Sequence, residues 1–315
     1  MDGSALSPYF QFEYKKLHFE VQMTEKCVLP KYKTSALRGG MGEMLLRENC
    51  IRDRNCSDCS LEEECIVRRI MYSQMRIQPA FMSDGDSVGY VIHCEDRAEE
   101  FQEGDTLSFY VLLFGRMAAY TGQIIRAFKQ LGENGLGRDK AQFAVKNVSE
   151  CEDTLENYVG FRKQRFLKQT LLRQSAAGSV DSIEKVKLRF RTPVAVKYRK
   201  EMLCSFDTAA LLQAVERRLY MLNCYEGIPV ERIQTDEHVP LLIRQQAVPV
   251  GVKRYSSRHG KNMWLNGILG EVILEAPDEV ALELLLAGEL VHIGKNTSFG
   301  FGKYTVHISA EPTEE

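Results

Sequence analysis

The sequence predicts an α+β protein built from two successive units with the same element order, strand–helix–strand–strand–helix–strand. Two observations support this prediction. Segments with apolar residues at every second position alternate with segments whose apolar residues recur every three or four, and the whole series occurs twice in 315 residues. In each pass a glycine-rich loop precedes the last strand, at 132–140 and at 293–302. This parallel favours a duplicated fold.

The second half shows the pattern more clearly. In residues 186–196 the apolar side chains alternate with Lys187, Arg189 and Arg191, which predicts a strand with one basic face. The remaining elements are a helix at 209–226 opened by 205–207 and closed by Gly227, strands at 248–258 and 263–276 joined by a turn, a helix at 279–290 capped by Asp278, and a strand at 303–310.

The first half repeats this order more loosely. Its expected elements are a strand at 12–23, a helix at 35–48 capped by Ser35, strands at 87–96 and 105–115, a helix at 117–132 and a strand at 142–149. The order β-α-β-β-α-β is that of ferredoxin-like (RRM-like) domains, in which one sheet face is open and often binds RNA. We expect a first domain at 1–150 with a cysteine-rich insertion at about 50–65, a linker at 151–180 and a second domain at 181–315.

Composition limits the class of protein. Hydrophobic residues make up 44% and charged residues 27%, as in ordinary globular proteins. No apolar run approaches the roughly 18 residues of a membrane span, and the N-terminus lacks the apolar stretch of a signal peptide, so we expect a cytoplasmic protein. The net charge of −2 argues against a chain that is basic throughout, but phosphate binding requires only a local basic surface.

Four of the nine cysteines lie in one short segment: Cys50, Cys56, Cys59 and Cys65. The spacing C-x5-C-x2-C-x5-C suits a tetrahedral site of four thiolates, which leaves no open position for catalysis. We expect structural zinc here. An iron–sulfur cluster uses the same ligands, and four reduced cysteines in a loop are the simpler alternative.

The glycine-rich loop at 294–302 combines features that suit a phosphodiester backbone. Free amides can form an anion-binding nest, Lys295 adds charge, and hydroxyls lie next to it. The alternative is a tight helix-to-strand connection that needs glycine for its geometry. The candidate RNA-binding residues of this loop are Gly294, Lys295, Asn296, Thr297, Ser298, Gly300 and Gly302.

Basic residues gather in three further places. The expected hairpin at 248–276 has a charged tip, the strand at 186–196 has a basic face, and Arg38 lies in the first turn of the first helix, where a helix N-terminus attracts phosphate. Each could instead be an ordinary solvated surface or part of a surface salt bridge. The candidate RNA-binding residues are Arg38, Lys187, Arg189, Arg191, Lys253, Arg254, Arg258 and Lys261.

Three segments resemble one known family. The sequence GKNTSFGFGKY at 294–304 is similar to the C-terminal glycine-rich loop of the RAMP superfamily of CRISPR proteins, and most resembles its Cas6 precursor-RNA endoribonucleases. Residues 37–43 (LRGGMGE) and 254–258 (RYSSR) are similar to segments of bacterial members. The resemblance follows nearly the whole chain in order.

The resemblance implies metal-independent cleavage of CRISPR repeat RNA, in which the 2′-hydroxyl attacks the adjacent phosphate. The products are a 2′,3′-cyclic phosphate and a 5′-hydroxyl. In the family a histidine near the first helix often acts as base, but this chain has no histidine between His18 and His93. The catalytic candidates are therefore His259, in the basic hairpin tip, and Tyr32 and Lys33, just before the first helix.

Two other functions are compatible with this sequence. A non-catalytic RAMP subunit would bind guide RNA in a CRISPR effector complex, and it would share the fold and the glycine-rich loop. An interaction protein could use the same scaffold and the metal site without RNA, because a fold alone does not determine function.

Overall fold

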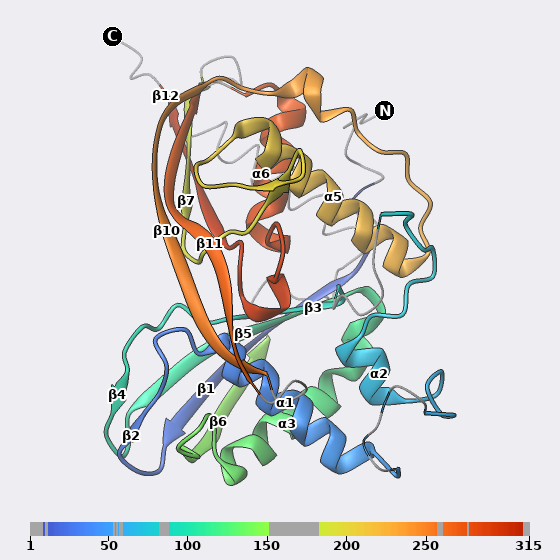
Figure 1. The fold of residues 1–315 in the computed structure, drawn as a ribbon, viewed down its shortest axis with the longest axis vertical. Coiled ribbons are helices and arrows are strands. Elements are labelled where there is room, and N and C mark those ends of the chain that lie inside the picture. Colours follow the sequence, from blue (N-terminus) through green and yellow to red (C-terminus); the bar gives the residue numbers. More distant parts are fainter. Residues whose placement is uncertain are drawn as a thin grey trace.

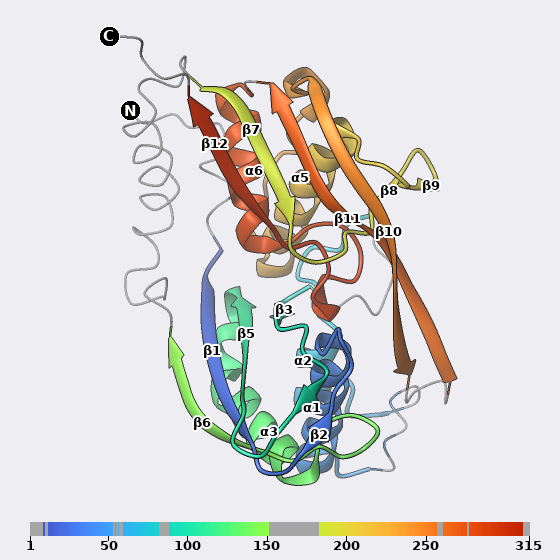
Figure 2. The same cartoon turned by 90° about the vertical axis from the view of Figure 1, so that its left-hand side faces the viewer.

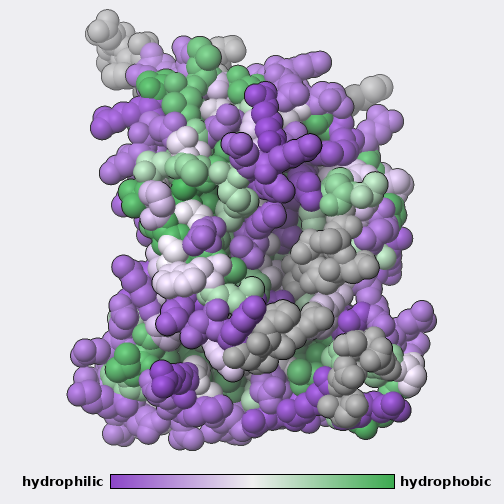
Figure 3. All heavy atoms as spheres, viewed as in Figure 1, coloured by the Kyte–Doolittle hydropathy of each residue, from purple (hydrophilic) through white to green (hydrophobic). Residues whose placement is uncertain are grey.

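The computed structural model describes residues 9, 12–52, 54, 56, 59–81, 88–150, 183–256, 261–275 and 277–310. Two four-stranded antiparallel sheets lie one above the other, each with its own pair of helices (Figures 1 and 2). On the face seen in Figure 3, hydrophilic side chains predominate and apolar ones form small separate patches. Among the described helices, none is both long and apolar enough to span a membrane.

The first unit has the expected element order. Its sheet runs β3-β5-β1-β6, which is the ferredoxin-like order with the first and third strands in the centre. The main elements are β1 (Tyr14–Met23), α1 (Thr34–Asn49), β3 (Tyr90–His93), β5 (Thr106–Phe114), α3 (Thr121–Asn134) and β6 (Phe143–Glu150).

The second unit repeats this topology, with the sheet order β10-β11-β7-β12. The tandem ferredoxin-like prediction is confirmed. Its main elements are β7 (Ile183–Phe190), α5 (Thr208–Glu226), β10 (Leu242–Ser256), β11 (Lys261–Glu275), α6 (Glu279–Val291) and β12 (Tyr304–Ala310). The predicted linker at 151–180 lies outside the described residues, so the domain boundaries stay a prediction.

The period of two in β1 explains why the first sheet has one buried face. Leu17, Phe19 and Val21 are fully buried, while the residues between them are partly exposed. The ring of Phe19 stacks on Phe109 of β5 at 4.9 Å and meets Phe128 of α3 at the same distance. The helices therefore cover one face of the sheet, and the other face remains open for a site.

Helix ends follow the sequence signals in the second unit but not in the first. Asp207 and Asp278 cap α5 and α6 by accepting hydrogen bonds from backbone amides, and Gly227 ends α5 in a left-handed conformation with φ 79°. Ser35 is not the predicted cap: α1 begins at Thr34, with Lys33 at the N-cap position and no side-chain capping bond. Lys33 takes this position because its side chain contacts residues 96 and 98, as described below.

Several short elements were not predicted from the sequence. The segment between α1 and β3 holds helix α2 (Ile66–Met71) as well as the four clustered cysteines. The others are the strand pairs β2 (Cys27–Val28) with β4 (Glu100–Phe101) and β8 (Lys197–Tyr198) with β9 (Glu201–Met202), and the short 3-10 turns η2 (Gly115–Tyr120), η5 (Thr235–His238) and η6 (Thr297–Phe299).

The hairpin β10–β11 is much longer than the rest of its sheet. Each strand has 15 residues, and they pair along their length, but β11 pairs with β7 only from Glu271 to Glu275. The remainder forms a two-stranded arm. Figure 2 shows this arm extending from the second unit down alongside the first, near α1. We call residues 248–256 and 261–269 the hairpin arm.

The two units are joined through a shared core and specific polar contacts. Their buried apolar residues form one continuous cluster. Arg218 of α5 is buried and donates hydrogen bonds to the carbonyl oxygens of Val88, in the first unit, and Val291, in the second. The relative position of the units is therefore fixed by packing, and residues from both can build one site.

Candidate nucleic-acid interface

The glycine-rich loop packs between the two units, and most of its backbone amides are already hydrogen-bonded. The amides of Lys295, Phe299, Gly300, Phe301 and Gly302 all donate to backbone carbonyl oxygens within the protein. The nest of free amides that the sequence predicted therefore does not exist over most of this loop. The acceptors for Lys295 and Gly302 are the carbonyls of Ala195 and Pro193, which belong to the distant segment after β7.

Burial separates the predicted loop residues into two groups. Thr297 and Ser298 are each only 6% exposed, and Gly300 and Gly302 are buried as well. Lys295 is exposed, while Gly294 and Asn296 are half-buried. Only this second group offers polar surface to an RNA in the described conformation.

The glycines are required because the loop passes close to other backbone. Gly300 has φ +82°, and a Cβ there would lie 2.7 Å from Cγ2 of Thr34 and 2.9 Å from the carbonyl oxygen of Ile92. Both neighbours belong to the first unit. Thr34 also donates a hydrogen bond of 2.6 Å from Oγ1 to the carbonyl oxygen of Phe299. The loop thereby presents the ring of Phe299 at the boundary of the units.

Two predicted arginines meet on that ring. The guanidinium carbon of Arg38, in α1, lies 4.2 Å from the Phe299 ring centroid, and that of Arg254, in the hairpin arm, lies 4.4 Å from it. Burial and the nearby charge of Arg38 lower the pKa of Arg254 from its usual value. Two like charges held this close favour an anion beside them. We call Arg38, Arg254 and Phe299 the arginine site.

Arg254 has no carboxylate partner among the described residues. Its Nη2 lies 3.6 Å from the sulfur of Met263, and its buried Nε has no hydrogen-bond acceptor in the part of the chain that the structure describes. An unpaired, partly buried guanidinium is unfavourable unless a ligand supplies the negative charge. This property distinguishes Arg254 from a surface arginine in a salt bridge.

Tyr32 lies next to the arginine site, whereas the side chain of Lys33 is buried. Tyr32 packs against the small cluster of Ala195, Val252 and Phe301, with the guanidinium of Arg97 4.7 Å from its ring centroid. The side chain of Lys33 has no solvent exposure. This burial does not fit the prediction that Lys33 is a catalytic residue.

Lys33 instead fixes the start of α1. Its Nζ donates to the carbonyl oxygens of Asp96 and Ala98, at 3.2 and 2.5 Å, and lies 3.6 Å from the Asp96 carboxylate. Burial lowers the pKa of Lys33, and the nearby Asp96 carboxylate opposes that shift. These contacts give the side chain a structural function and hold Thr34 in place for its contact with Phe299.

The other predicted basic residues are distributed unevenly. Lys187 pairs with Glu271 at 2.7 Å, and Arg191 pairs with Glu95 at 3.0 Å, so neither charge is freely available. Arg189, Lys253 and Lys261 are exposed. His259, the expected base, and Arg258 lie outside the described residues.

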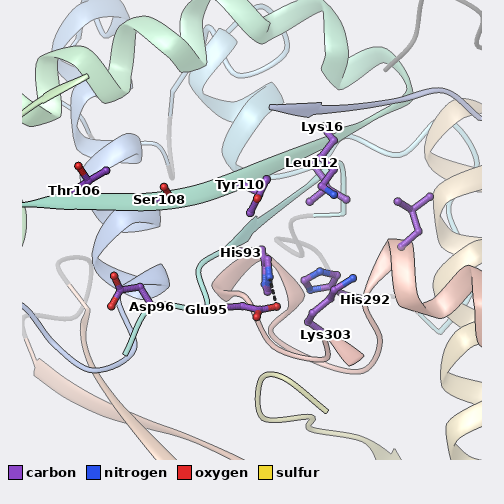
Figure 4. Close-up of a pocket in the computed structure, with 11 residues that line it drawn as sticks. Lys16, His93, Glu95, Asp96, Thr106, Ser108, Tyr110, Leu112, His292 and Lys303 are labelled. Carbon is purple, nitrogen blue, oxygen red and sulfur yellow. Dashed lines mark hydrogen bonds and ion pairs between the residues drawn. The ribbon is translucent and has the colours of Figure 1, made fainter. Parts of the chain in front are cut away.

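A second polar site that the sequence did not predict lies between the units. It is a pocket of about 500 Å³ lined by the open face of the first sheet and by the end of α6 (Figure 4). His93 of β3 and His292 after α6 approach edge to face, with ring centroids 5.4 Å apart. Tyr110 of β5, Lys16 of β1 and Lys303 are among the other polar residues that line it. In the sequence each histidine is next to apolar residues, so no local pattern marks either one as part of a polar site.

Burial keeps the pocket histidines neutral. It lowers the pKa of His93 and lowers that of His292 well below its usual value. His93 donates from Nε2 to Glu95 at 3.0 Å, and its buried Nδ1 has no hydrogen-bond partner among the described residues. The bond from His93, with that from Arg191, lowers the pKa of Glu95 to about 2. The ion pair between Glu95 and Arg191 thereby links the first unit to the second.

The four clustered cysteines are all free and partly exposed. Burial, followed by the charge of Cys65, raises the pKa of Cys56, and Cys50 and Cys59 act in the same direction, so the four thiols lie near one another. The donor chemistry suits zinc. The side chains as described do not, however, converge into a group that could hold an ion. A metal here remains a proposal.

The fold and the arginine site define the class: a tandem ferredoxin-like protein with a basic site where its two units meet. A family model described as an N-terminal domain matches residues 12–172, and the model described as CRISPR-associated endoribonuclease Cas6 matches residues 188–304. The second unit of the chain therefore matches the CRISPR-associated Cas6 family. The resemblance found in the sequence is confirmed.

Individual relatives are distant in sequence. An uncharacterized protein of Archaeoglobus fulgidus is 22% identical over 283 residues, which cover 88% of this chain and 92% of the relative. The structure titled "Cas6 (TTHB231) product complex" has a TM-score of 0.54 at 12% identity and covers 94% of this chain and 99% of that one. Thermus thermophilus Cas6 (TTHB231) has a TM-score of 0.50 at 11% identity, with coverage of 94% and 99%.

A larger assembly contains a similar fold. The structure titled "Partial Cas6-RT-Cas1--Cas2 complex" matches with a TM-score of 0.58 at 13% identity over 96% of this chain. This chain spans 47% of that relative's length. At these identities the structural matches establish the fold.

Proposed function

We propose that this protein binds CRISPR repeat RNA at the junction of its two units and cleaves it at a defined position. The reaction is attack of a 2′-hydroxyl on the adjacent phosphorus, which breaks the bond to the 5′-oxygen. The products are a 2′,3′-cyclic phosphate and a 5′-hydroxyl, and no metal ion takes part in the step. The match of residues 188–304 to the Cas6 endoribonuclease model supports RNA processing as the general activity.

The arginine site is the observation on which this proposal depends. Arg38 and Arg254 come from different units and lie on one ring, and Arg254 has no carboxylate partner within the described residues. A phosphodiester bound between the two guanidiniums would supply the missing negative charge. The same cations would stabilise the additional charge that develops on the phosphorane, and thereby accelerate cleavage.

Two residues are proposed to transfer protons in this reaction. Tyr32, which packs beside the arginine site, is the proposed donor of a proton to the leaving 5′-oxygen. His259 is the proposed base, because in the sequence it follows Arg254 within one basic segment. The base takes the proton of the attacking hydroxyl.

The test uses the purified full chain and its own repeat RNA in excess chelator. A single cut with a cyclic phosphate end, abolished when the nucleotide before the cut carries a 2′-deoxyribose, is the expected result. Cleavage that survives the 2′-deoxy substitution would contradict the mechanism. Tight binding without a product would favour the alternative, a non-catalytic subunit that keeps guide RNA. No binding would contradict both.

Two accessory features belong to the same proposal. The four-cysteine segment holds structural zinc, away from the reacting phosphate, and four thiolate ligands would leave the ion no open position. Association with other CRISPR proteins is supported by the fold of the assembly named above, in which the matching region is part of a longer chain.

A further inference from the structure

The outer face of the hairpin arm carries two large exposed aromatic side chains. Trp264 is 62% exposed and Tyr255 is 65% exposed. In the register of the arm, Lys253 lies opposite Trp264 and Tyr255 lies opposite Asn262. Directly opposed residues, and residues two apart on one strand, share a face of a β-ribbon. These side chains therefore form a single surface.

This surface is on the opposite side of the arm from the arginine site. Arg254 pairs with Met263, and Val252 pairs with Leu265. Val252 and Leu265 pack in the small cluster beside the glycine-rich loop, as Arg254 packs on Phe299. Because side chains alternate along a strand, Lys253, Tyr255 and Trp264 must face away from that site. We call them, with Gly251 and Asn262, the outer aromatic face.

The indole ring of Trp264 packs against Gly251. A Cβ at this position would lie 3.1 Å from Cε3 and 3.3 Å from Cζ3 of Trp264. The six-membered ring of the indole therefore rests on the backbone of Gly251, which has no side chain to lift it. One part of the ring is supported in this way, while most of the side chain stays exposed.

Among the described residues, the contact with Gly251 accounts for only part of the Trp264 ring. Among the residues that the structure describes, no aromatic ring, cation or hydrogen-bond acceptor is paired with its indole. Exposed apolar surface of this size is unfavourable in water and commonly marks a binding surface. The indole is therefore available to stack with a ligand from outside.

Charge identifies the kind of ligand. Residues 241–270 contain Arg244, Lys253, Arg254, Arg258 and Lys261 and no acidic residue. Three exposed aliphatic residues lie farther from the tip of the hairpin, at Leu241, Ile243 and Val248. The distal half of the arm thus combines aromatic rings with cations, which is the chemistry that binds single-stranded nucleic acid through its bases and phosphates.

We propose that the outer aromatic face binds unpaired nucleobases of an RNA, with Trp264 as the stacking platform. Lys253 contacts the phosphate next to the stacked base, and Tyr255 extends the platform toward the tip of the arm. This inference rests on the proposed function, since it names a second contact for the same RNA. It adds a preference for a single-stranded segment, because a paired base is already stacked on its neighbours.

The experiment exploits the fact that Trp264 is the only tryptophan of the chain. Short single-stranded oligoribonucleotides and a fully paired RNA duplex of equal length are titrated into the full-length protein. We expect saturable quenching of tryptophan fluorescence by the single strands and little quenching by the duplex. Binding is measured in parallel by fluorescence anisotropy of labelled RNA.

Three variants test the assignment. We expect Trp264→Ala to weaken single-strand binding about tenfold, because one base–aromatic stack is lost. Gly251→Val keeps the indole but displaces it from the backbone at this position, and should weaken binding to a similar extent. Leu241→Ala, just before the start of β10, removes an apolar side chain of comparable exposure and should have no effect.

The outcomes separate this inference from the proposed function. RNA that binds and is cleaved without any change in tryptophan fluorescence would overturn the stacking platform and leave the endoribonuclease intact. Unchanged RNA affinity in Trp264→Ala, with loss of binding to a CRISPR protein subunit, would reassign the face to a protein partner and also overturn the inference. Absence of RNA binding altogether would remove both proposals.

Discussion

The hydroxyl of Thr34 donates a hydrogen bond of 2.6 Å to the carbonyl oxygen of Phe299, and it does so from one ferredoxin-like unit to the other. Thr34 begins helix α1, and Phe299 lies in the glycine-rich loop before β12. This contact fixes the ring on which Arg38 and Arg254 meet. The geometry of the arginine site therefore depends on how the two units are docked.

Loss of this bond should weaken both stability and the site. Thr34→Val keeps the shape of the side chain but leaves a buried carbonyl oxygen unpaired, so we expect a loss of about 1–2 kcal/mol in the free energy of unfolding. Urea denaturation measures it. Thr106→Val, at an exposed position of β5, is the control and should change stability by much less.

Two glycine substitutions test whether the glycine-rich loop is closely packed between the units. Gly300→Ala would place a methyl group against Thr34 and Ile92 at a positive φ, and should destabilise by roughly 1–3 kcal/mol. Gly39→Ala, in α1, meets no atom within 4 Å and should stabilise by about 0.5–1 kcal/mol. Thermal unfolding of both variants is the measurement. Equal effects of the two would contradict the close packing of the loop.

The arginine site predicts a change in the salt dependence of RNA binding. Arg38→Ala and Arg254→Ala should each lower affinity and reduce the slope of log K against log salt by about 0.7, the value for one phosphate contact of a single strand. Lysine at either position should restore the slope but only part of the affinity, because it lacks the planar guanidinium. Arg126→Ala, which removes an exposed α3 residue paired with Glu48, should leave the slope unchanged.

Glu95 should make stability depend on pH in a defined window. Its pKa is lowered to about 2, so its contribution is complete above the ordinary glutamate pKa of 4.5 and disappears as the pH falls toward 2. Glu95→Gln should therefore cost on the order of 0.5–1 kcal/mol at pH 7, a small value because the side chain is 42% exposed, and nothing near pH 2. A constant difference between the two proteins across this range would show that the charge of Glu95 does not stabilise the fold.

The cysteine segment predicts a measurable metal content. Protein purified with zinc present should contain about one zinc ion per chain, and Cys59→Ser should lower this content and the melting temperature. Cys204→Ser, at an exposed cysteine outside the segment, should change neither. Elemental analysis distinguishes zinc from iron. Chelation should lower the melting temperature while repeat cleavage at lower temperature continues.

Local sequence patterns predicted both units because each strand and helix has its own apolar period. The alternation at Leu17, Phe19 and Val21 and the caps at Asp207 and Asp278 are properties of short segments, and they survive in the structure. The cap at Ser35 failed because the buried contacts of Lys33 with residues 96–98 determine where α1 begins. Those partners are more than sixty positions away and leave no local signal.

The site was predicted only in part for the same reason. Arg38, Arg254 and the glycine-rich loop were identified from their residue types, but their convergence on Phe299 depends on docking of the units. The amides of Lys295 and Gly302 appeared free in the sequence because their acceptors, the carbonyls of Ala195 and Pro193, come from a different segment. The sequence around His93 and around His292 gives no indication that the two rings meet across a pocket.

Arg254 and Lys253 are consecutive, and they point to opposite sides of a ribbon that is only two strands wide. A polynucleotide that touches both sides at once has to turn around the edge of β10, where the described part of the chain supplies no neighbouring strand. A stiff double helix cannot follow so sharp a bend. The narrow ribbon would thus select RNA segments that are single-stranded.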